Sequence, residues 1–217
     1  MNGRRRKPEA GVQVRITRRH TIRGNTPYEG VAFRAFSFSE IETGAVPVQV
    51  RFPDSWSYDA CRLLFEKCLL RTGIVDGLTA VSEDDVPDWL WRHEASNSSH
   101  QRNTHGEGDL RQVIDRIAGA WTYHGWKGGY FDAEEDARAF FDETRWLICH
   151  RRISPNLAQW QSTGLFWAYG LDGHESDSFV TDFRTGSVRR AEAGDLPPHG
   201  AVINATHGAM TGEGGIW

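Results

Sequence analysis

Residues 109–148, DLRQVIDRIAGAWTYHGWKGGYFDAEEDARAFFDETRWLI, contain the strongest helical pattern in this sequence. The spacing Asp109-x-x-Gln112 is typical of a capping box, in which two side chains satisfy the free backbone amides at a helix start. Apolar residues then recur at intervals of three and four along one face: Leu110, Val113, Ile114, Ile117, Ala118 and Trp121. Glycines end this helix, and Asp132-x-x-Glu135 is expected to cap a second one. The stretch therefore predicts a helical hairpin.

Apolar and polar residues alternate in three short stretches before this hairpin, at 12–17, 31–36 and 46–52. Alternation places the apolar side chains on one face of a strand. We therefore expect a small antiparallel sheet, with Pro47 keeping its strand at the edge because proline donates no ladder hydrogen bond.

The sequence between this sheet and the hairpin contains three further segments with different patterns. Residues 55–71 have a helical pattern that ends near Gly73, and residues 82–92 predict a short helical piece with an acidic start. Residues 94–108 are rich in Ser, Asn, His and Gly and have no periodicity, which predicts a flexible loop.

The remaining elements complete an α+β arrangement. Pro155 opens a short aromatic helix, residues 179–191 predict a β-hairpin around Thr185-Gly186, and residues 201–205 predict one more strand. Strands, then helices, then strands again favour α+β over a doubly wound sheet. Residues 1–11 predict a disordered basic tail, and residues 12–217 predict one domain.

Composition restricts the function classes. The 217 residues include 25 Lys or Arg and 29 Asp or Glu, giving a net charge of −4, which argues against a whole-domain nucleic-acid binder. No apolar run approaches the length of a membrane span, so we expect no membrane contact.

Three cysteines, Cys61, Cys68 and Cys149, are too few and too scattered for a disulfide framework. They indicate a reducing cytoplasm and read as small buried apolar residues. No CxxC pair, HExxH pair, phosphate-binding glycine motif or GxSxG elbow is present, so we assign no metal ligand and no catalytic residue. The acidic trios at 83–85 and 134–136 are interpreted as helix caps.

Two longer stretches, residues 119–143 and 153–173, closely resemble the N-terminal region of adenosylcobalamin-dependent (class II) ribonucleotide reductases. The stretches at 86–92, 179–186 and 197–204, followed by Glu213-Gly-Gly-Ile216, support the resemblance in the same order and spacing. It covers residues 12–217, which correspond to the first portion of a full-length reductase.

The resemblance implies a radical reaction. In that family cobalamin homolysis generates a cysteine thiyl radical inside a barrel, the radical takes a ribose 3′ hydrogen, and two other cysteines supply the electrons. The segment resembling residues 197–204 is the first barrel strand, which implies the first strand of an incomplete reductase barrel here. Its pattern has a redox cysteine where this chain has Ala201, so Ala201 marks a lost redox position.

The family also implies where substrate would lie, near the segments resembling Pro155–Trp160 and His199–Ala201. We therefore select Asn156, Gln159, His199 and Gly200 as candidate substrate-binding residues. The alternative is that these residues only hold the helix and the strand together. The sequence departs from the family here, because Leu157-Ala158 and Gln161-Ser162 replace the usual Ser-Pro and Phe-Asn pairs.

The resulting hypothesis is the N-terminal portion of a B12-dependent ribonucleoside-diphosphate reductase, with triphosphate substrates left open. It would supply scaffold and part of the substrate wall, and would be inactive without a separately encoded reductase barrel. Ribonucleotide substrate would bind through that complex. This chain alone would bind no cofactor, whereas the complete enzyme would use adenosylcobalamin. The alternative is a non-catalytic paralogue that acts as an interaction or nucleic-acid-associated module.

Overall fold

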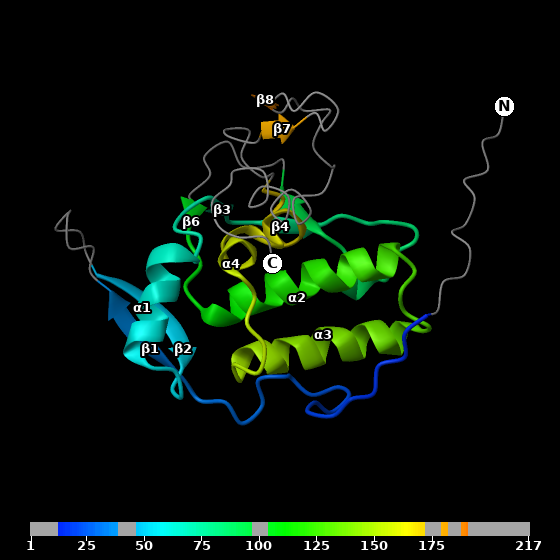
Figure 1. Ribbon diagram of the computed structural model, residues 1–217, viewed down its shortest axis with the longest axis horizontal. Coiled ribbons are helices and arrows are strands. Elements are labelled where there is room, and N and C mark those ends of the chain that lie inside the picture. The colour runs from blue at the N-terminus through cyan, green and yellow to red at the C-terminus, as the bar shows by residue number, and fades with distance from the viewer. Residues whose placement is uncertain (1–12, 39–46, 97–103, 172–178, 182–187, 191–217) are drawn as a thin grey trace.

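The structure is a computed structural model that describes residues 13–38, 47–96, 104–171, 179–181 and 188–190. These residues form an α+β fold of helices and small antiparallel strand pairs (Figure 1). Its elements in chain order are β1 Phe33–Phe38, β2 Val48–Pro53, α1 Tyr58–Lys67, β3 Ile74–Val75, β4 Leu78–Ala80, the 3₁₀ turn η1 Asp88–Leu90, β5 His93–Ala95, β6 Thr104–His105, α2 Leu110–Lys127, α3 Glu134–Cys149, α4 Leu157–Ser162, α5 Leu165–Tyr169, β7 Phe179–Thr181 and β8 Val188–Arg190.

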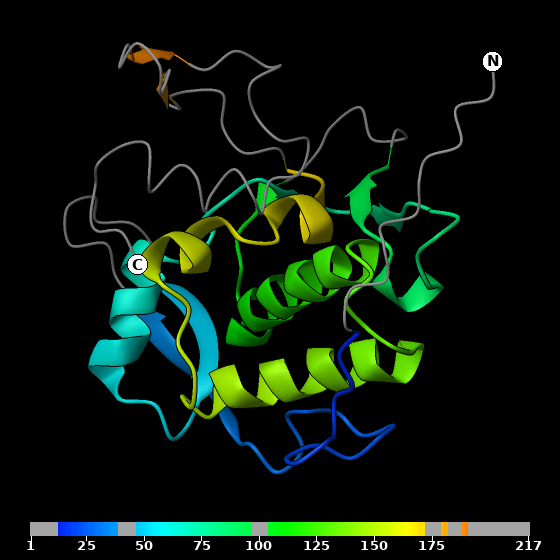
Figure 2. The ribbon, with the colours of Figure 1, turned by 45° about the vertical axis from the view of Figure 1, so that its right-hand side comes forward.

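Helices α2 and α3 lie side by side and confirm the predicted hairpin (Figures 1 and 2). Asp109 caps α2 as expected: its Oδ1 accepts from the amide of Arg111 at 2.9 Å, and Gln112 Oε1 accepts from the amide of Asp109 at 3.0 Å. The predicted apolar face of α2 is buried, apart from the half-buried Trp121. The hairpin is thus fixed by its cap and its packing face.

The start of α3 differs from the prediction by one residue. Ala133, not Asp132, is the N-cap, and Asp136 Oδ2 accepts from the amide of Ala133 at 3.0 Å. Asp132 instead forms an ion pair with Arg15 at 2.6 Å. A tertiary contact therefore occupies the carboxylate that sequence spacing assigned to the cap.

The predicted three-stranded sheet has two strands. Antiparallel β1 and β2 pair in the register Phe36↔Val50. The segment at 12–17 is not a strand, because it makes only a parallel bridge between Val14 and Phe131. Its amides bond elsewhere: Val14 donates to the carbonyl oxygen of Tyr130 at 2.7 Å, and Ile16 donates to Asp136 Oδ1 of α3 at 2.7 Å. Pro47 lies immediately before β2.

Helix α1 covers the β1–β2 pair and is shorter than the predicted 55–71. Ser57 caps it, and it ends at Lys67, well before Gly73. The main core lies among α1, β1–β2, α2 and the end of α3. Its buried members include Phe38, Val50, Phe52, Cys61, Phe65, Ile114, Ile117 and Ile148.

A second, smaller cluster contains Val86, Leu90 and Tyr123. The predicted helical piece at 82–92 is reduced to η1, and β4 pairs with β5 on either side of it. The described ends of the expected loop at 94–108 enter strands: β5 ends at Ala95, and β6 pairs with β3. Residues 97–103 lie outside the described residues.

Helices α4 and α5 lie on the side of α2 away from α3 (Figure 2). The predicted short helix after Pro155 is therefore two helices, separated at Gly164. The predicted β-hairpin is confirmed by the pairing of β7 with β8. The expected strand at 201–205, its barrel role and the tail at 1–11 lie outside the described residues. Across the described ranges, no helix is both long and apolar enough to cross a bilayer.

Candidate functional site

Helix α4 carries two of the four residues selected from the sequence, and they cap it together. Asn156 Oδ1 accepts from the amide of Gln159 at 2.9 Å, and Gln159 Oε1 accepts from the amide of Asn156 at 3.2 Å. This reciprocal capping box uses the side-chain oxygens. Their NH₂ groups keep hydrogen-bond donors with no partner among the described residues. The pair can therefore hold the helix and still donate to a polar ligand.

Arg116 of α2 anchors the C-terminal end of α4. Its side chain is completely buried. Its Nη2 donates to the carbonyl oxygen of Trp160 at 2.7 Å, and its Nη1 donates to that of Thr163 at 2.6 Å. Arg116 thus satisfies the carbonyl groups that the end of a short helix leaves free, and it fixes the position of α4.

Glu107 neutralises Arg116 and connects it to the rest of the core. The two side chains are fully buried, with 2.6 Å between Arg116 Nε and Glu107 Oε1. Glu107 also accepts from the amide of Leu70 at 2.9 Å and from the hydroxyl of Tyr169 at 3.1 Å. One carboxylate therefore links the end of α1, helix α2 and helix α5. Burial raises the pKa of Tyr169, so its hydroxyl stays a donor.

Close backbone approach also positions α4 and α5. Gly164 has a φ of +85°, and a Cβ there would overlap the carbonyl group of Arg116. A side chain at this position is excluded both by the left-handed backbone and by lack of space. The segment from Pro155 to Tyr169 is therefore held against α2 by charge, hydrogen bonds and steric fit.

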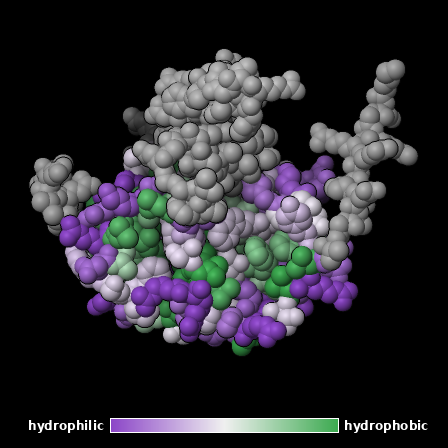
Figure 3. Space-filling view, viewed as in Figure 1, coloured by the Kyte–Doolittle hydropathy of each residue, from purple (hydrophilic) through white to green (hydrophobic). Residues whose placement is uncertain are grey.

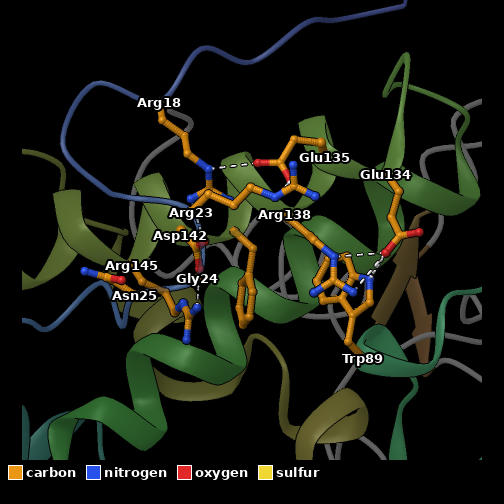
Figure 4. A pocket seen from close by; sticks show the side chains of 11 residues that line it. Arg18, Arg23, Gly24, Asn25, Trp89, Glu134, Glu135, Arg138, Asp142 and Arg145 are labelled. Atoms are coloured by element: carbon orange, nitrogen blue, oxygen red, sulfur yellow. Dashed lines mark hydrogen bonds and ion pairs between the residues drawn. The ribbon is translucent and has the colours of Figure 1, made fainter.

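A separate charged cavity of about 620 Å³ lies where the N-terminal segment crosses α3 (Figure 4). Arg18 pairs with Glu135 at 2.9 Å and with Asp142 at 2.6 Å. On the opposite side, Trp89 donates to Glu134 at 2.9 Å, and the guanidinium of Arg138 lies 4.4 Å from the centre of a Trp89 ring.

The arginines of this cavity already have acidic partners, including Arg23 with Glu135 and Arg145 with Asp142. The trio at 134–136 was interpreted as a helix cap, and it does lie in the first turn of α3. Its side chains also bind the N-terminal segment, which that interpretation did not include. The arrangement fastens residues 15–23 to α3 rather than presenting free positive charge to an anion.

The other acidic trio was interpreted wrongly. Glu83 does not cap a helix: it accepts from the hydroxyl of Tyr123 at 2.8 Å and from Lys127 at 2.7 Å. Burial alone would raise the pKa of Glu83, but these two hydrogen bonds lower it. Burial raises the pKa of Tyr123. The proton therefore stays on the phenol, and these hydrogen bonds join the segment before η1 to α2.

The three cysteines are buried and free, as the sequence indicated. Burial raises the pKa of Cys61, Cys68 and Cys149 to about 11. They are therefore almost entirely protonated at neutral pH and chemically quiet. No group of three His, Cys, Asp or Glu residues able to hold a metal ion occurs within the described ranges.

The structure brings Asn156 and Gln159 together, whereas His199, Gly200 and Ala201 lie outside the described residues. Sequence reasoning missed Arg116 and Glu107. A signal for Arg116 was present, because it falls three residues after Val113 and four before Ala120 on a buried face. Glu107 had no such signal within an aperiodic segment.

Comparison with known proteins gives one consistent result. Residues 42–151 match the family model of the class II vitamin B12-dependent ribonucleotide reductase. Vitamin B12-dependent ribonucleotide reductases of Bradyrhizobium diazoefficiens and Agrobacterium fabrum are 39% and 38% identical over 94% of this chain. The Streptomyces coelicolor protein of the same name is 26% identical over 75% of the chain. This chain spans only 17% of the length of the first two relatives.

Proposed function

This chain belongs to the class II vitamin B12-dependent ribonucleotide reductase family, and from that premise we propose that it is the N-terminal part of a ribonucleoside-diphosphate reductase. The observation that carries the proposal is similarity over 94% of the chain to proteins about six times its length. The chain then contributes to deoxyribonucleotide formation but does not perform it alone.

In this proposal the segment from Pro155 to Trp160 forms part of the substrate wall. A wall must hold its shape when substrate binds, because catalytic geometry tolerates little displacement. The completely buried Arg116 and Glu107 supply that rigidity beneath α4. Asn156 and Gln159 would donate through their side-chain amides to polar groups of a ribonucleotide. The rest of the chain serves as scaffold for this segment.

The described residues do not fit adenosylcobalamin. Pockets for drug-sized ligands have volumes of about 300–1,000 Å³, and the corrin cofactor is considerably larger than such a ligand. The charged cavity of about 620 Å³ is lined by arginines that already have acidic partners, and the apolar groove beside α4 is smaller, at about 430 Å³. The proposal therefore assigns cobalamin, which supplies the radical when bound, to the remainder of the reductase.

The partner in this proposal is a separately encoded reductase barrel, and ribonucleotide binds in the complex of the two. The proposed location is the reducing cytoplasm, with which three unpaired cysteines agree. The alternative of a non-catalytic interaction or nucleic-acid-associated module uses the basic residues at 1–11 or the aromatic surface, and its main support is Ala201 in place of the redox cysteine. The basic residues and Ala201 lie outside the described residues. No observation on the described residues favours it.

Reconstitution tests the proposal. The Bradyrhizobium diazoefficiens relative is produced without the stretch that matches this chain, and this chain is supplied either as a separate polypeptide or fused in place of the missing stretch. We expect adenosylcobalamin-dependent formation of deoxyribonucleotides in at least one format and none from either part alone. Absence of product in both formats, with the intact relative active, contradicts the proposal.

A further inference from the structure

An apolar groove of about 430 Å³ lies between α1, the end of α3 and the start of α4. Trp56 and Trp160 line it from the core side and are buried. Its rim is exposed: Leu63 is 57% exposed, Leu157 54% and Ile153 39%. Figure 3 shows apolar surface over α1 and between α1 and the neighbouring helices. Adjoining exposed apolar side chains of this kind mark interaction sites on soluble proteins.

Two arginines follow α3 directly, and the first of them, Arg151, lines this groove. Arg151 adopts a left-handed backbone conformation, with a φ of 55°, which favours glycine. Its guanidinium donates to the carbonyl oxygen of Ser55 at 3.4 Å. Within the described ranges, neither Arg151 nor Arg152 has a carboxylate at ion-pair distance. The left-handed conformation ends α3 in a Schellman motif, in which the amide of Arg151 donates to the carbonyl oxygen of Ile148 at 2.9 Å and the amide of Arg152 donates to that of Leu147 at 2.8 Å. The side chain of Arg151 places a positive charge beside the apolar surface.

We propose that this groove is the docking site for the part of the reductase that follows the region matched by this chain. The occupant is a segment whose apolar side chains fill the groove and whose Asp or Glu pairs with Arg151. This inference rests on the proposed function. About five-sixths of the length of the relatives lies outside the match, so a large body of polypeptide remains to contact this domain.

The position of the groove supports that occupant. Pro155 and Leu157 line the groove and belong to the segment that carries Asn156 and Gln159. A body seated in the groove would therefore lie beside those two residues. Docking and completion of the substrate wall would then occur at one place.

Cysteine labelling measures whether the groove is covered, without requiring turnover. The substitution Leu157→Cys is made in the isolated chain and in the fusion with the remainder of the Bradyrhizobium diazoefficiens relative. The three thiols of this chain are buried, and the maleimide-labelled peptide that carries the introduced cysteine is quantified by mass spectrometry, which separates it from the cysteines of the relative. We expect labelling at least ten-fold slower in the fusion. The control is Ile22→Cys, because Ile22 is 67% exposed and lies outside the groove. Equal rates for Leu157→Cys in both proteins, or equal slowing at both positions, overturn the proposal.

A second variant, Arg151→Gly, tests whether docking requires the positive charge of Arg151. Glycine adopts this backbone conformation without strain, so the Tm of the isolated chain should stay the same or rise. In the fusion we expect labelling of Leu157→Cys to become several-fold faster, because the ion pair to the docked segment is lost. An unchanged labelling rate contradicts the proposed ion pair between Arg151 and an Asp or Glu of the docked segment. The Tm of the variant distinguishes this result from a defect in folding.

The outcomes separate this inference from the proposed function. Protection of Leu157→Cys in a fusion that forms no deoxyribonucleotides supports docking and contradicts the function. Turnover without protection of Leu157→Cys supports the proposed function and contradicts docking. Sedimentation of the isolated chain tests whether a second copy of the chain occupies the groove instead. A dimer that Leu157→Glu converts to a monomer would overturn the proposal. A fusion that is insoluble, while the intact relative is soluble, contradicts both.

Discussion

Arg116 has the largest fully buried side chain among the described residues, and its charge is neutralised only by Glu107. A buried ion pair adds little over a well-packed apolar pair, because desolvating two charges offsets their attraction. Removal of one partner is different, since the other then remains buried and uncompensated. The structural role of this pair is to hold the carbonyl groups of Trp160 and Thr163 in position.

We expect Arg116→Met to lower the free energy of unfolding by about 3–5 kcal/mol, because it leaves the charge of Glu107 buried without the opposite charge that neutralises it. Urea denaturation of the isolated chain measures this. The double variant Arg116→Met with Glu107→Gln should lose less than the sum of the two single changes. The matched control is Arg62→Met, which breaks the exposed pair with Glu66 and should change the free energy of unfolding far less. A similar small loss for Arg116→Met would contradict the role given to the pair.

Glu143 fastens the N-terminal segment to α3. Its Oε1 accepts from the amides of Arg19, His20 and Thr21 at 2.8–3.1 Å and from the hydroxyl of Thr21 at 2.8 Å. Burial alone would raise the pKa of Glu143, but these hydrogen bonds outweigh burial and lower it. Because the folded-state pKa is lowered, Glu143 stabilises the fold above the ordinary pKa of 4.5. That contribution is lost as the pH falls through the lowered value.

The corresponding prediction concerns acid stability. Urea midpoints of the native chain should fall between pH 6 and pH 3, and Glu143→Gln should reduce this fall because its amide does not titrate in that range. Glu134→Gln, which alters an exposed carboxylate on the same helix, serves as the control and should keep the native pH dependence. An identical pH dependence for Glu143→Gln and the native chain would show that Glu143 is not responsible.

At the scale of elements, α2 is the shared support. It packs against α3 on one side and against α4 and α5 on the other (Figure 2). The contact with α5 depends on Gly119, because a Cβ there would overlap the ring of Trp167. That ring cannot rotate away freely, since its Nε1 donates to the carbonyl oxygen of Leu90 at 3.0 Å.

Gly119→Ala should therefore destabilise the chain although alanine is the better helix former. Helix propensity favours alanine by about 1 kcal/mol, whereas overpacking costs about 1–3 kcal/mol and reaches the upper end where a ring is overlapped. We expect a net loss of about 2 kcal/mol in thermal or urea denaturation. Gly108→Ala is the control, because no atom lies within 4 Å of a Cβ there. Stabilisation by Gly119→Ala would show that the α2–α5 contact relaxes readily.

Local signals predicted the elements whose hydrogen bonds are local. The α2 cap, the α2–α3 hairpin and the β7–β8 pair follow from spacing along the chain and agree with the structure. The predictions failed where a side chain or amide takes a distant partner. Ile16 bonds to Asp136 and so does not continue a sheet, and Asp132 pairs with Arg15 and so does not cap α3.

The candidate site shows the same limit. Family resemblance points to Asn156 and Gln159. The spacing Asn156-x-x-Gln159 is also typical of the capping box that they form. The Arg116–Glu107 pair joins a helix to a segment without periodicity. The pairing of Glu107 with Arg116 could not be inferred from a local pattern, because it depends on how α1, α2, α4 and α5 pack together.

At the scale of the whole molecule, the two apolar clusters are joined through α2. Ile114 and Ile117 belong to the main core, and Tyr123 belongs to the second cluster with Val86 and Leu90. A rigid helix that contributes to both clusters couples their stability, since neither can lose its packing without freeing part of the same element. The molecule should therefore unfold as one unit.

Tryptophan fluorescence and far-UV circular dichroism test this coupling. Trp89, Trp91, Trp126 and Trp167 surround the second cluster, and Trp56, Trp121 and Trp160 belong to or pack against the main core. Fluorescence therefore reports both clusters, whereas circular dichroism reports the helices. We expect coincident urea transitions. Leu90→Ala in the second cluster and Leu110→Ala in the main core remove completely buried side chains, and each should cost about 2–5 kcal/mol. Both variants should shift the two signals together. If Leu90→Ala splits the fluorescence transition into two steps, the second cluster unfolds independently and α2 does not couple the two.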